Sequence, residues 1–360
     1  MIFRSAASEA GVPPRPRTVG LTVIVPAYSR TEFLPGAVRS LLAQRAGVAW
    51  PVEILVVKNF ASPGLEDLVR SESVATLEFG SRVYGSTIAR AIRASRGKVI
   101  AFLEDDDLFD PTKLARLEAV FAKEPSVTFY HNDYREIDRA GGPSRPSAQR
   151  RGIDRRVRGR GLERYAGAEK VRAFDRIGDS VPSAHLSCIA MRREALTRVL
   201  DRLERVPIGV DFFLFFVALA SEGEIVIDPE KLTLYRRHPG NSSRSLSFDP
   251  AWYGELVEGS RRMAEETRGM VDDLGRRELH PILDGELAAH ALYVATSAPV
   301  PRRRAVGSAL LELLGRTQTL HGVGRKGLCG EGALFSLSPS IAARLLRPRS
   351  VSSAGTRKVG

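Results

Sequence analysis

Short apolar runs alternate with amphipathic stretches through the first 135 residues. The runs rich in β-branched and aromatic residues predict five strands: Leu21–Ala27, Glu53–Val57, Ala75–Phe79, Lys98–Leu103 and Val127–Tyr130. The stretches between them have apolar residues at helical spacing and predict four helices: Glu32–Gln44, Gly64–Ser71, Ser86–Ser95 and Thr112–Lys123. Asp110 is the expected N-cap of the last helix, with Pro111 at its first position. This alternation predicts a mostly parallel, doubly wound α/β sheet.

The pattern changes twice farther along the chain. Residues 141–172 contain nine arginines against three acids, with scattered glycine and proline and no clear periodicity. We therefore expect a mobile basic loop there. The pattern resumes with a strand in "HLSCIAMR", a helix at Arg193–Leu203, and "VDFFLFFVALASEG", which is apolar on nearly all sides and predicts a buried helix. Two strand-like runs around Asp228-Pro229 follow.

These changes divide the chain into four parts. We expect a disordered arm over residues 1–19, an α/β domain over 20–245, a helical region over 246–346 and a disordered tail over 347–360. Helical spacing within the third part predicts helices at Gly285–Ala295, Ala305–Leu314 and Ile341–Leu346.

Charge and cysteine content narrow the class of protein. The formal net charge of +12 and a pI of about 10.1 favour an anionic partner, such as nucleotide phosphates, nucleic acid or an acidic membrane surface. Two cysteines cannot form a disulfide framework, and Cys188 in an apolar run is expected to be buried in a reducing compartment. The longest strongly apolar run, Phe212 to Ala220, is too short to span a bilayer. We expect a cytoplasmic protein, attached at most to the inner face of the membrane.

Unusual residues follow three of the predicted strands. "PAYSR" follows the first strand, "KNFAS" the second and "EDDD", Glu104 to Asp107, the fourth. Ligands of doubly wound sheets bind beyond the carboxyl ends of the strands, so these stretches predict one site.

Four adjacent carboxylates repel one another and must be solvated or neutralised. A solvated turn before the next helix is one interpretation, since helix N-termini favour negative charge. A calcium loop is a second, but "EDDDLFDPTKLA" lacks the glycine that such a loop needs. A divalent cation that joins the carboxylates to a diphosphate is the third, and the pattern favours it.

Three segments carry a resemblance to a known family. "LTVIVPAYSRTEFLPGAVRSLLAQ", "GSTIARAIRASRGKVIAFLEDDDLFDPTKL" and "LYRRHPGNSS" together resemble glycosyltransferase family 2 over about residues 20–245. The resemblance implies a GT-A-like, Rossmann-like catalytic domain with an Asp-x-Asp metal motif. It also implies a nucleoside-diphosphate sugar donor, a hydroxyl acceptor, Mg²⁺ or Mn²⁺, and transfer with inversion.

The resemblance also implies roles for residues of the donor site. Pro26, Ala27, Tyr28 and Arg30 match the segment that passes the nucleotide base and ribose. Asp106 matches the metal ligand, with Asp105 or Asp107 in support and Glu104 nearer the ribose. Asp107 has an alternative as an acid that precedes the helix without binding a ligand.

Two residues near the end of the resemblance match catalytic positions. Asp211 in "GVDFFLF" matches the general base that deprotonates the acceptor hydroxyl, although it could also cap the apolar helix. His238 matches a residue that completes the metal shell in some members, and Arg236 is expected to neutralise phosphate oxygens. A structural role for His238 stays open.

One departure concerns the base of the donor. The family usually has acids after the second strand, and this chain has Lys58-Asn59 instead. Asn59 could still hydrogen-bond a base edge. The missing carboxylate argues against a uridine donor, or means that the protein binds the base in another way. Gly85 is expected to permit a close backbone approach and Arg90 to support the donor phosphates; packing at a helix start is the alternative for both.

Two other functions remain as alternatives. A nucleotidyltransferase could use a similar sheet, but the sequence lacks a glycine-rich, lysine-bearing phosphate loop. A non-enzymatic protein that binds nucleic acid or another polyanion would account for the positive charge. Aromatic residues should then alternate with the arginines, and Tyr165 is the one aromatic residue of the segment 141–172. Nucleic acid is therefore not favoured, and an anionic membrane surface or polyanionic acceptor suits these arginines better.

Overall fold

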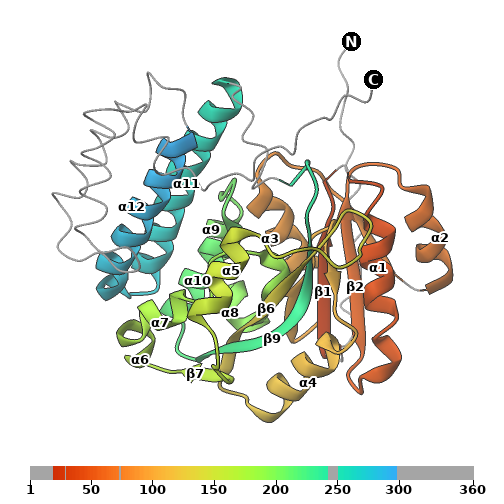
Figure 1. The fold of residues 1–360 in the computed structure, drawn as a ribbon, viewed down its shortest axis with the longest axis horizontal. Coiled ribbons are helices and arrows are strands. Elements are labelled where there is room, and N and C mark those ends of the chain that lie inside the picture. The colour runs from red at the N-terminus through yellow and green to blue at the C-terminus, as the bar shows by residue number, and fades with distance from the viewer. Residues whose placement is uncertain (1–18, 29, 73, 242–249, 298–360) are drawn as a thin grey trace, which may run out of the picture.

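The computed structural model describes residues 19–297 except 29, 73 and 242–249 (Figure 1). Nine strands form one sheet: β1 Leu21–Pro26, β2 Val52–Lys58, β3 Ala75–Glu78, β4 Val99–Phe102, β5 Leu108–Phe109, β6 Val127–Ile137, β7 Glu163–Tyr165, β8 Ile189–Arg192 and β9 Glu224–Arg236. The helices within these residues are α1 Leu34–Leu42, α2 Pro63–Glu72, α3 Tyr84–Ala94, α4 Lys113–Lys123, α5 Ala148–Arg156, α6 Glu169–Arg172, α7 Phe174–Gly178, α8 Arg193–Thr197, α9 Leu200–Leu203, α10 Val210–Ala220, α11 Pro250–Asp273 and α12 His280–Ser297.

The sheet is parallel in its first half and mixed in its second. Its strand order is β3-β2-β1-β4-β8-β6-β9-β5, with β7 paired to β9. β1 pairs in parallel with β2 and β4, whereas β8 runs antiparallel between β4 and β6. The predicted α/β class is confirmed, and the parallel arrangement holds where strands and helices alternate in the sequence. The arrangement becomes mixed after β6, where that alternation stops.

The carboxyl ends of β1, β2 and β4 meet at one edge. The Ala27 N–H, just after β1, donates to the Val57 carbonyl in β2 at 2.8 Å. The Leu103 N–H, just after β4, donates to the Ile24 carbonyl in β1 at 3.0 Å. The three unusual stretches therefore lie side by side, as the sequence predicted.

The predicted cap of α4 is displaced by two residues. The helix begins at Lys113, with Thr112 in the N-cap position. The Asp110 carboxylate instead accepts hydrogen bonds from the N–H and hydroxyl of Thr112, at 3.1 and 2.8 Å. Asp110 and Pro111 thus form the turn that precedes the helix.

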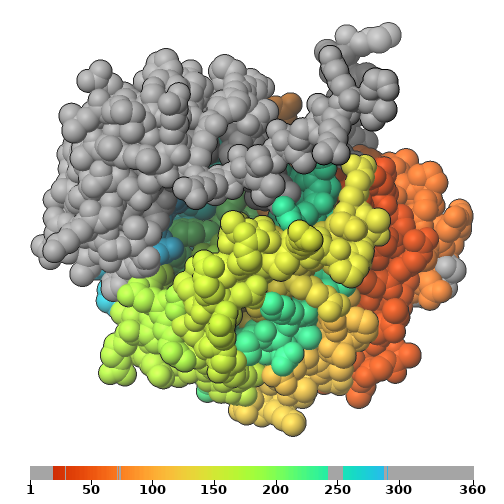
Figure 2. Space-filling model, viewed as in Figure 1, coloured from red at the N-terminus to blue at the C-terminus, as the bar shows by residue number. Residues whose placement is uncertain are grey.

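The expectation of a loop over residues 141–172 is wrong. The segment contains α5, β7 and α6, and its surface crosses the face shown in Figure 2 in yellow and green. Ser147 caps α5 by accepting from the Arg150 N–H at 3.0 Å. The Arg150 side chain is 1% exposed and pairs with Asp133 of β6 and with Asp154. Asp133, which is 17 residues away on β6, therefore anchors this arginine-rich segment through Arg150.

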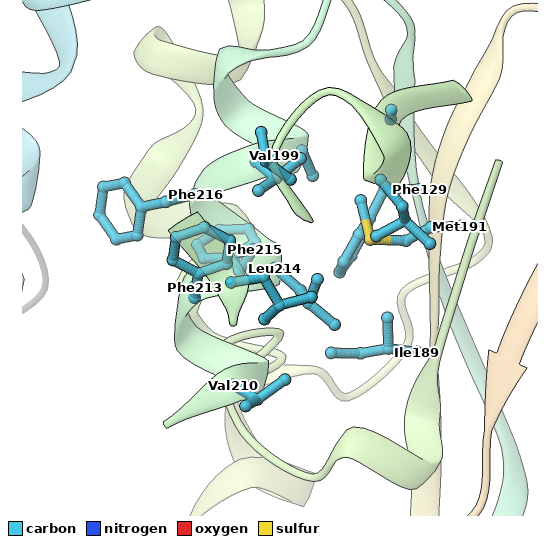
Figure 3. Close-up of a cluster of buried hydrophobic side chains, with 14 of the residues drawn as sticks. Phe129, Ile189, Met191, Val199, Val210, Phe213, Leu214, Phe215 and Phe216 are labelled. Atoms are coloured by element: carbon cyan, nitrogen blue, oxygen red, sulfur yellow. The ribbon is translucent and has the colours of Figure 1, made fainter. Parts of the chain in front are cut away.

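Helix α10 is fixed by an apolar cluster (Figure 3). Phe213, Phe215 and Phe216 pack with buried side chains from the sheet, including Phe129 and Met191. Truncating a buried phenylalanine costs about 3–5 kcal/mol of folding free energy, so this cluster holds the helix firmly.

The region after residue 250 is helical as far as the structure describes it. Met263 and Met270 of α11 are buried in the apolar cluster that holds α10, and α12 packs on α11. The helix predicted at Gly285–Ala295 is part of α12. The helices predicted at Ala305–Leu314 and Ile341–Leu346, the N-terminal arm through residue 18 and the C-terminal tail lie outside the described residues. Across the described residues, no helix combines the length and apolar character needed to cross a membrane.

Candidate active site

The four acids after β4 lie at the edge where the parallel strands end. Asp105, Asp106 and Asp107 are only 2%, 4% and 0% exposed, and Glu104 is half-buried. Burying a carboxylate costs free energy unless cations or hydrogen-bond donors compensate it. The neighbours of these acids therefore decide what the cluster can do.

The segment after β1 contacts two of the acids directly. The Tyr28 N–H donates to Asp105 Oδ2 at 2.9 Å. Arg30 Nη1 lies 3.0 Å from Asp105 Oδ1 and 2.6 Å from Asp106 Oδ2, so one guanidinium bridges both carboxylates. The structure thus brings together four residues assigned to the donor site from the sequence. The Tyr28 side chain is itself 60% exposed.

The turn from His238 to Asn241 closes over Asp106. His238 Nε2 lies 3.0 Å from Asp106 Oδ2, and Asn241 Nδ2 lies 3.4 Å from the same oxygen. The Gly240 N–H donates to His238 Nδ1 at 3.2 Å, so the proton of the neutral ring is on Nε2. His238 therefore donates a hydrogen bond to Asp106, and a metal bond through Nε2 would require the other tautomer.

Arg236 forms hydrogen bonds with the acid turn and with a neighbouring backbone carbonyl. Its N–H donates to Asp107 Oδ1 at 3.0 Å, its Nε to the Asp106 carbonyl at 2.7 Å and its Nη1 to the Arg139 carbonyl at 2.7 Å. Its guanidinium also stacks on the Phe33 ring at 4.9 Å. Arg236 is buried, and its Nε and Nη1 donate to backbone carbonyls, so its expected role toward phosphate stays a prediction.

Asp107 lies beneath the surface of the site. Its Oδ1 accepts the Arg236 N–H, and its Oδ2 has no hydrogen-bond partner among the described residues. Burial raises the pKa of Asp107 to about 7, and Asp106 contributes to the rise. With no exposed surface, Asp107 cannot reach a bound metal without a rearrangement, so its predicted metal role is not supported by this geometry.

Glu104 and Asp105 also resist ionisation. Burial raises the pKa of Glu104 well above its ordinary value, and Asp107, Asp106 and Asp211 raise it further. Burial raises the pKa of Asp105 to about 6, against the lowering effect of Arg30. The cluster therefore carries more negative charge than its protein partners neutralise, and a bound cation would stabilise it.

Asp211 lies in the first turn of α10, within electrostatic reach of Glu104. The helix follows Gly209, whose φ of +67° is a conformation that favours glycine. Burial raises the pKa of Asp211 to about 6, while the N–H groups of Phe212 and His185 donate to its carboxylate and lower it. A carboxyl group with this pKa is largely ionised at neutral pH and can accept a proton.

A small pocket adjoins the acids at the end of β2. It is lined by Tyr28, Asn59, Tyr84 and their neighbours, so Asn59 lies where a base edge could contact it. Burial raises the pKa of Tyr84 well above its ordinary value, and Glu104, Asp105 and Asp211 add to the effect. Tyr84 therefore lies between this pocket and the carboxylates.

Gly85 and Arg90 make other contacts than the expected ones. A Cβ at Gly85 would lie 2.0 Å from the Leu203 carbonyl oxygen, and its N–H donates to the Val206 carbonyl at 2.8 Å. The Arg90 guanidinium lies over the Phe79 ring at 5.1 Å on an exposed face. The helix-start packing that the sequence left as an alternative accounts for Gly85, because its N–H is not free for a phosphate.

Sequence reasoning assigned no role to Asn241, Tyr84 or His185. Asn241 belongs to the quoted "HPGN", so its turn residues were a local signal. His185 has a left-handed backbone with φ +63°, and its ring lies between Tyr134 and Tyr235 with centroid distances of 4.3 and 4.7 Å. No local pattern indicates that its N–H would reach Asp211.

The carboxylate oxygens of the acid cluster decide whether it could hold a cation. In the part of the chain that the structure describes, no three His, Cys, Asp or Glu side chains form a group able to hold a metal by themselves. The Asp106 carboxylate offers hard oxygen ligands of the type that Mg²⁺ and Mn²⁺ prefer. Its Oδ2 forms an ion pair with Arg30, whose side chain is partly exposed. Asp106 thus fits a metal that takes its remaining ligands from a substrate.

Comparison with known proteins gives three findings. The model of glycosyl transferase family 2 matches residues 22–200. The succinoglycan biosynthesis protein ExoO of Rhizobium meliloti is 26% identical over 343 residues, which cover 91% of this chain and 86% of that protein. An uncharacterized glycosyltransferase of Rickettsia bellii is 30% identical over 129 residues, which cover 35% of this chain and 18% of that protein.

The fold is similar to that of a solved structure, S. aureus TarS 1-349 in complex with UDP-GlcNAc. The TM-score is 0.52 at 13% sequence identity, and the match covers 89% of this chain and 91% of that one. This similarity supports the fold alone. The match to the family model includes the strand that precedes the acid cluster, and with the match to ExoO it shows that the chain belongs to glycosyltransferase family 2 and is a glycosyltransferase.

Proposed function

We propose that the protein is a metal-dependent, inverting glycosyltransferase that moves a sugar from a nucleoside-diphosphate donor to an acceptor hydroxyl. One observation carries this proposal. Buried carboxylates at the ends of the parallel strands exceed their cationic partners, and Asp211 faces the same cluster. A metal diphosphate would supply the missing positive charge together with a reactive sugar.

The residues after β1 and β2 suit the nucleoside part of the donor. Tyr28 offers an exposed ring for the base, and Asn59 offers an amide for its edge. TarS is described in complex with UDP-GlcNAc, which supports a nucleotide-sugar donor for a chain of similar fold. We assign Pro26, Ala27, Tyr28, Asn59, Glu104 and Asp105 to this part of the site.

Asp106 is the residue that would hold Mg²⁺ or Mn²⁺. A bound metal would neutralise charge that develops on the departing diphosphate. Arg30 now contacts the same carboxylate and would instead face the diphosphate when the metal is present. His238 and Asn241 orient Asp106 through their hydrogen bonds.

Asp211 is the proposed general base. Its carboxylate accepts the proton of the acceptor hydroxyl as that oxygen attacks the anomeric carbon. The bond from the anomeric carbon to the diphosphate breaks in the same displacement, so the configuration at this carbon inverts. The hydrogen bonds from Phe212 and His185 hold the carboxylate in place for the transfer.

The arginine-rich segment suits an anionic surface. Arg145, Arg151, Arg155, Arg158 and Arg172 are exposed and form no ion pairs within the described residues. We propose that they contact the headgroups of an acidic membrane at the inner face, where each lysine or arginine contributes about 1 kcal/mol. Co-sedimentation with phosphatidylglycerol vesicles tests this contact, and binding that is equal to that with phosphatidylcholine vesicles would contradict it.

Thermal unfolding tests the catalytic proposal. The full chain is heated with UDP, GDP, dTDP, CDP or ADP, each with and without Mn²⁺. We expect one diphosphate to raise the midpoint by mass action, only with the metal, and Asp106→Ala to abolish the shift. No shift of the wild-type protein with any diphosphate and Mn²⁺ would contradict the proposal.

A further inference from the structure

A second cleft lies beside the donor pocket. Its volume is about 740 Å³, and it is bounded by the start of α3, the loop before α10 and the helix α11. Val83, Pro207 and Ile208 form its apolar wall, and Glu258 and Arg262 of α11 lie opposite. α11 packs against both α9 and α10, beside which it lies in Figure 1. A rigid helix therefore forms one side of the cleft.

The cleft adjoins the proposed chemistry. Tyr28 lines both this cleft and the small pocket of the donor site. The Tyr84 N–H donates to the Pro207 carbonyl at 3.3 Å. The negative charges of Glu104 and Asp211 raise the pKa of the Tyr84 side chain. The loop that forms the apolar wall continues directly into α10 and its Asp211. A molecule in the cleft would thus contact the loop that leads to the proposed base.

The polar side chains of the cleft are available for a ligand. Arg82, Glu255 and Arg262 line it and make no hydrogen bond or ion pair among the described residues. Glu258 is paired with Arg261 on the outer side of α11. Carboxylates and guanidinium groups of mixed sign do not select a strongly charged ligand. Their planar, forked donors and acceptors instead match adjacent hydroxyl groups, and an exposed aromatic ring packs against the C–H face of a sugar.

We propose that this cleft binds the acceptor, and that the acceptor is a saccharide chain of several units. A volume of this size exceeds that of one hexose and lies within the range of ligand clefts between packed elements. Tyr28 and the apolar wall contact sugar faces, and Arg82, Glu255 and Arg262 bind hydroxyl groups. The terminal hydroxyl reaches Asp211. This inference rests on the proposed function, because it identifies the second substrate of the same reaction.

Gly254 allows the cleft to be blocked without disturbing the fold. It lies on α11, it lines the cleft, and a Cβ placed on it meets no atom within 4 Å. Gly254→Phe would therefore add a bulky ring to the wall of the cleft from a position whose Cβ is free of contacts. Gly178 at the end of α7 is equally open and lies outside the cleft, so Gly178→Phe is the matched control.

The experiment is saturation-transfer NMR of the full chain with a panel of neutral oligosaccharides of several units, made up of cello-, malto-, chito- and galacto-oligosaccharides. We expect the wild-type protein and Gly178→Phe to transfer saturation to at least one oligosaccharide, and Gly254→Phe to lose this transfer by more than tenfold. Arg262→Ala provides a second, smaller change and should weaken binding about tenfold through the loss of a charged hydrogen bond. Undiminished transfer to Gly254→Phe, or no transfer to the wild-type protein, would overturn the proposal.

A parallel measurement separates this inference from the proposed function. The midpoint shift with the nucleoside diphosphate and Mn²⁺ should be the same for Gly254→Phe and the wild-type protein. If that shift remains while oligosaccharide binding is unaffected by Gly254→Phe, the cleft assignment fails and the donor site stands. If the wild-type protein shows no nucleotide shift, the proposed function itself fails.

Discussion

Two groups of charged side chains, one at β6 and β9 and one beyond the end of β4, differ in balance. In the first, Arg150 and Lys231 pair with Asp133 and Asp154. Burial raises the pKa of Asp133, against the lowering effect of Arg150, whereas Lys231 and Arg150 lower the pKa of Asp154 below its ordinary value. We call this set the balanced cluster, because each acid has a cationic partner.

The second group is the acid cluster of Glu104–Asp107 and Asp211. Arg30 bridges two of its carboxylates, and the pKa values of Glu104, Asp105, Asp107 and Asp211 are all raised. The balanced cluster satisfies itself and stabilises the fold. The acid cluster is satisfied only in part, and that deficit marks a site for a substrate or cation.

The largest effect is expected at the proposed base. Asp211→Asn keeps the shape of the side chain but cannot accept the proton, so kcat should fall by about 10²–10⁴-fold. The midpoint shift with nucleoside diphosphate and Mn²⁺ should remain, because the donor binds elsewhere. A variant that loses both turnover and the nucleotide shift would place Asp211 in donor binding instead.

Breaking the balanced cluster should affect stability rather than nucleotide binding. Arg150→Ala leaves Asp133 buried without its partner and should lower the free energy of unfolding by about 3–5 kcal/mol. Urea unfolding measures this change, and Arg151→Ala is the control, since Arg151 is exposed one residue away. A loss below about 1 kcal/mol would mean that the cluster contributes little to the fold.

The acid cluster predicts an unusual dependence of stability on pH. The pKa of Asp107 is about 7 in the folded chain and near 4 when unfolded, so the folded state holds more protons between these values. This contribution to stability is present below pH 4 and is lost as pH rises through about 7. Asp107→Asn should therefore gain about 1 kcal/mol or more relative to the wild-type protein at pH 8. Metal-free thermal unfolding at pH 5 and pH 8 measures it, and an equal difference at both values would contradict this origin.

The smallest expected effect is in the pH profile of the reaction. Because the pKa of Asp211 is about 6, kcat/KM should fall as pH drops below this value, approaching tenfold per pH unit. Initial rates between pH 5 and pH 8 test the profile. A rate that does not change across this interval would exclude a base with this pKa.

The sequence by itself determined the frame of the active site. Local periodicity predicts the parallel strands and the helices between them. The sequence "EDDD" places four acids after β4. The sequence predicts one site for Arg30, Tyr28 and the acid turn, because parallel strands end at a common edge. The position of His238 above Asp106 also followed from the resemblance.

The tertiary structure alone decided how the charges are compensated. Arg150 belongs to a segment that read as a loop, since its partner Asp133 is 17 residues away and on another element. Arg236, expected to face phosphate, is engaged by backbone carbonyls, and Asp107 is completely buried. Local sequence specifies which groups a strand or helix carries. Which buried charge finds a partner depends on contacts between distant segments, and packing alone settles that.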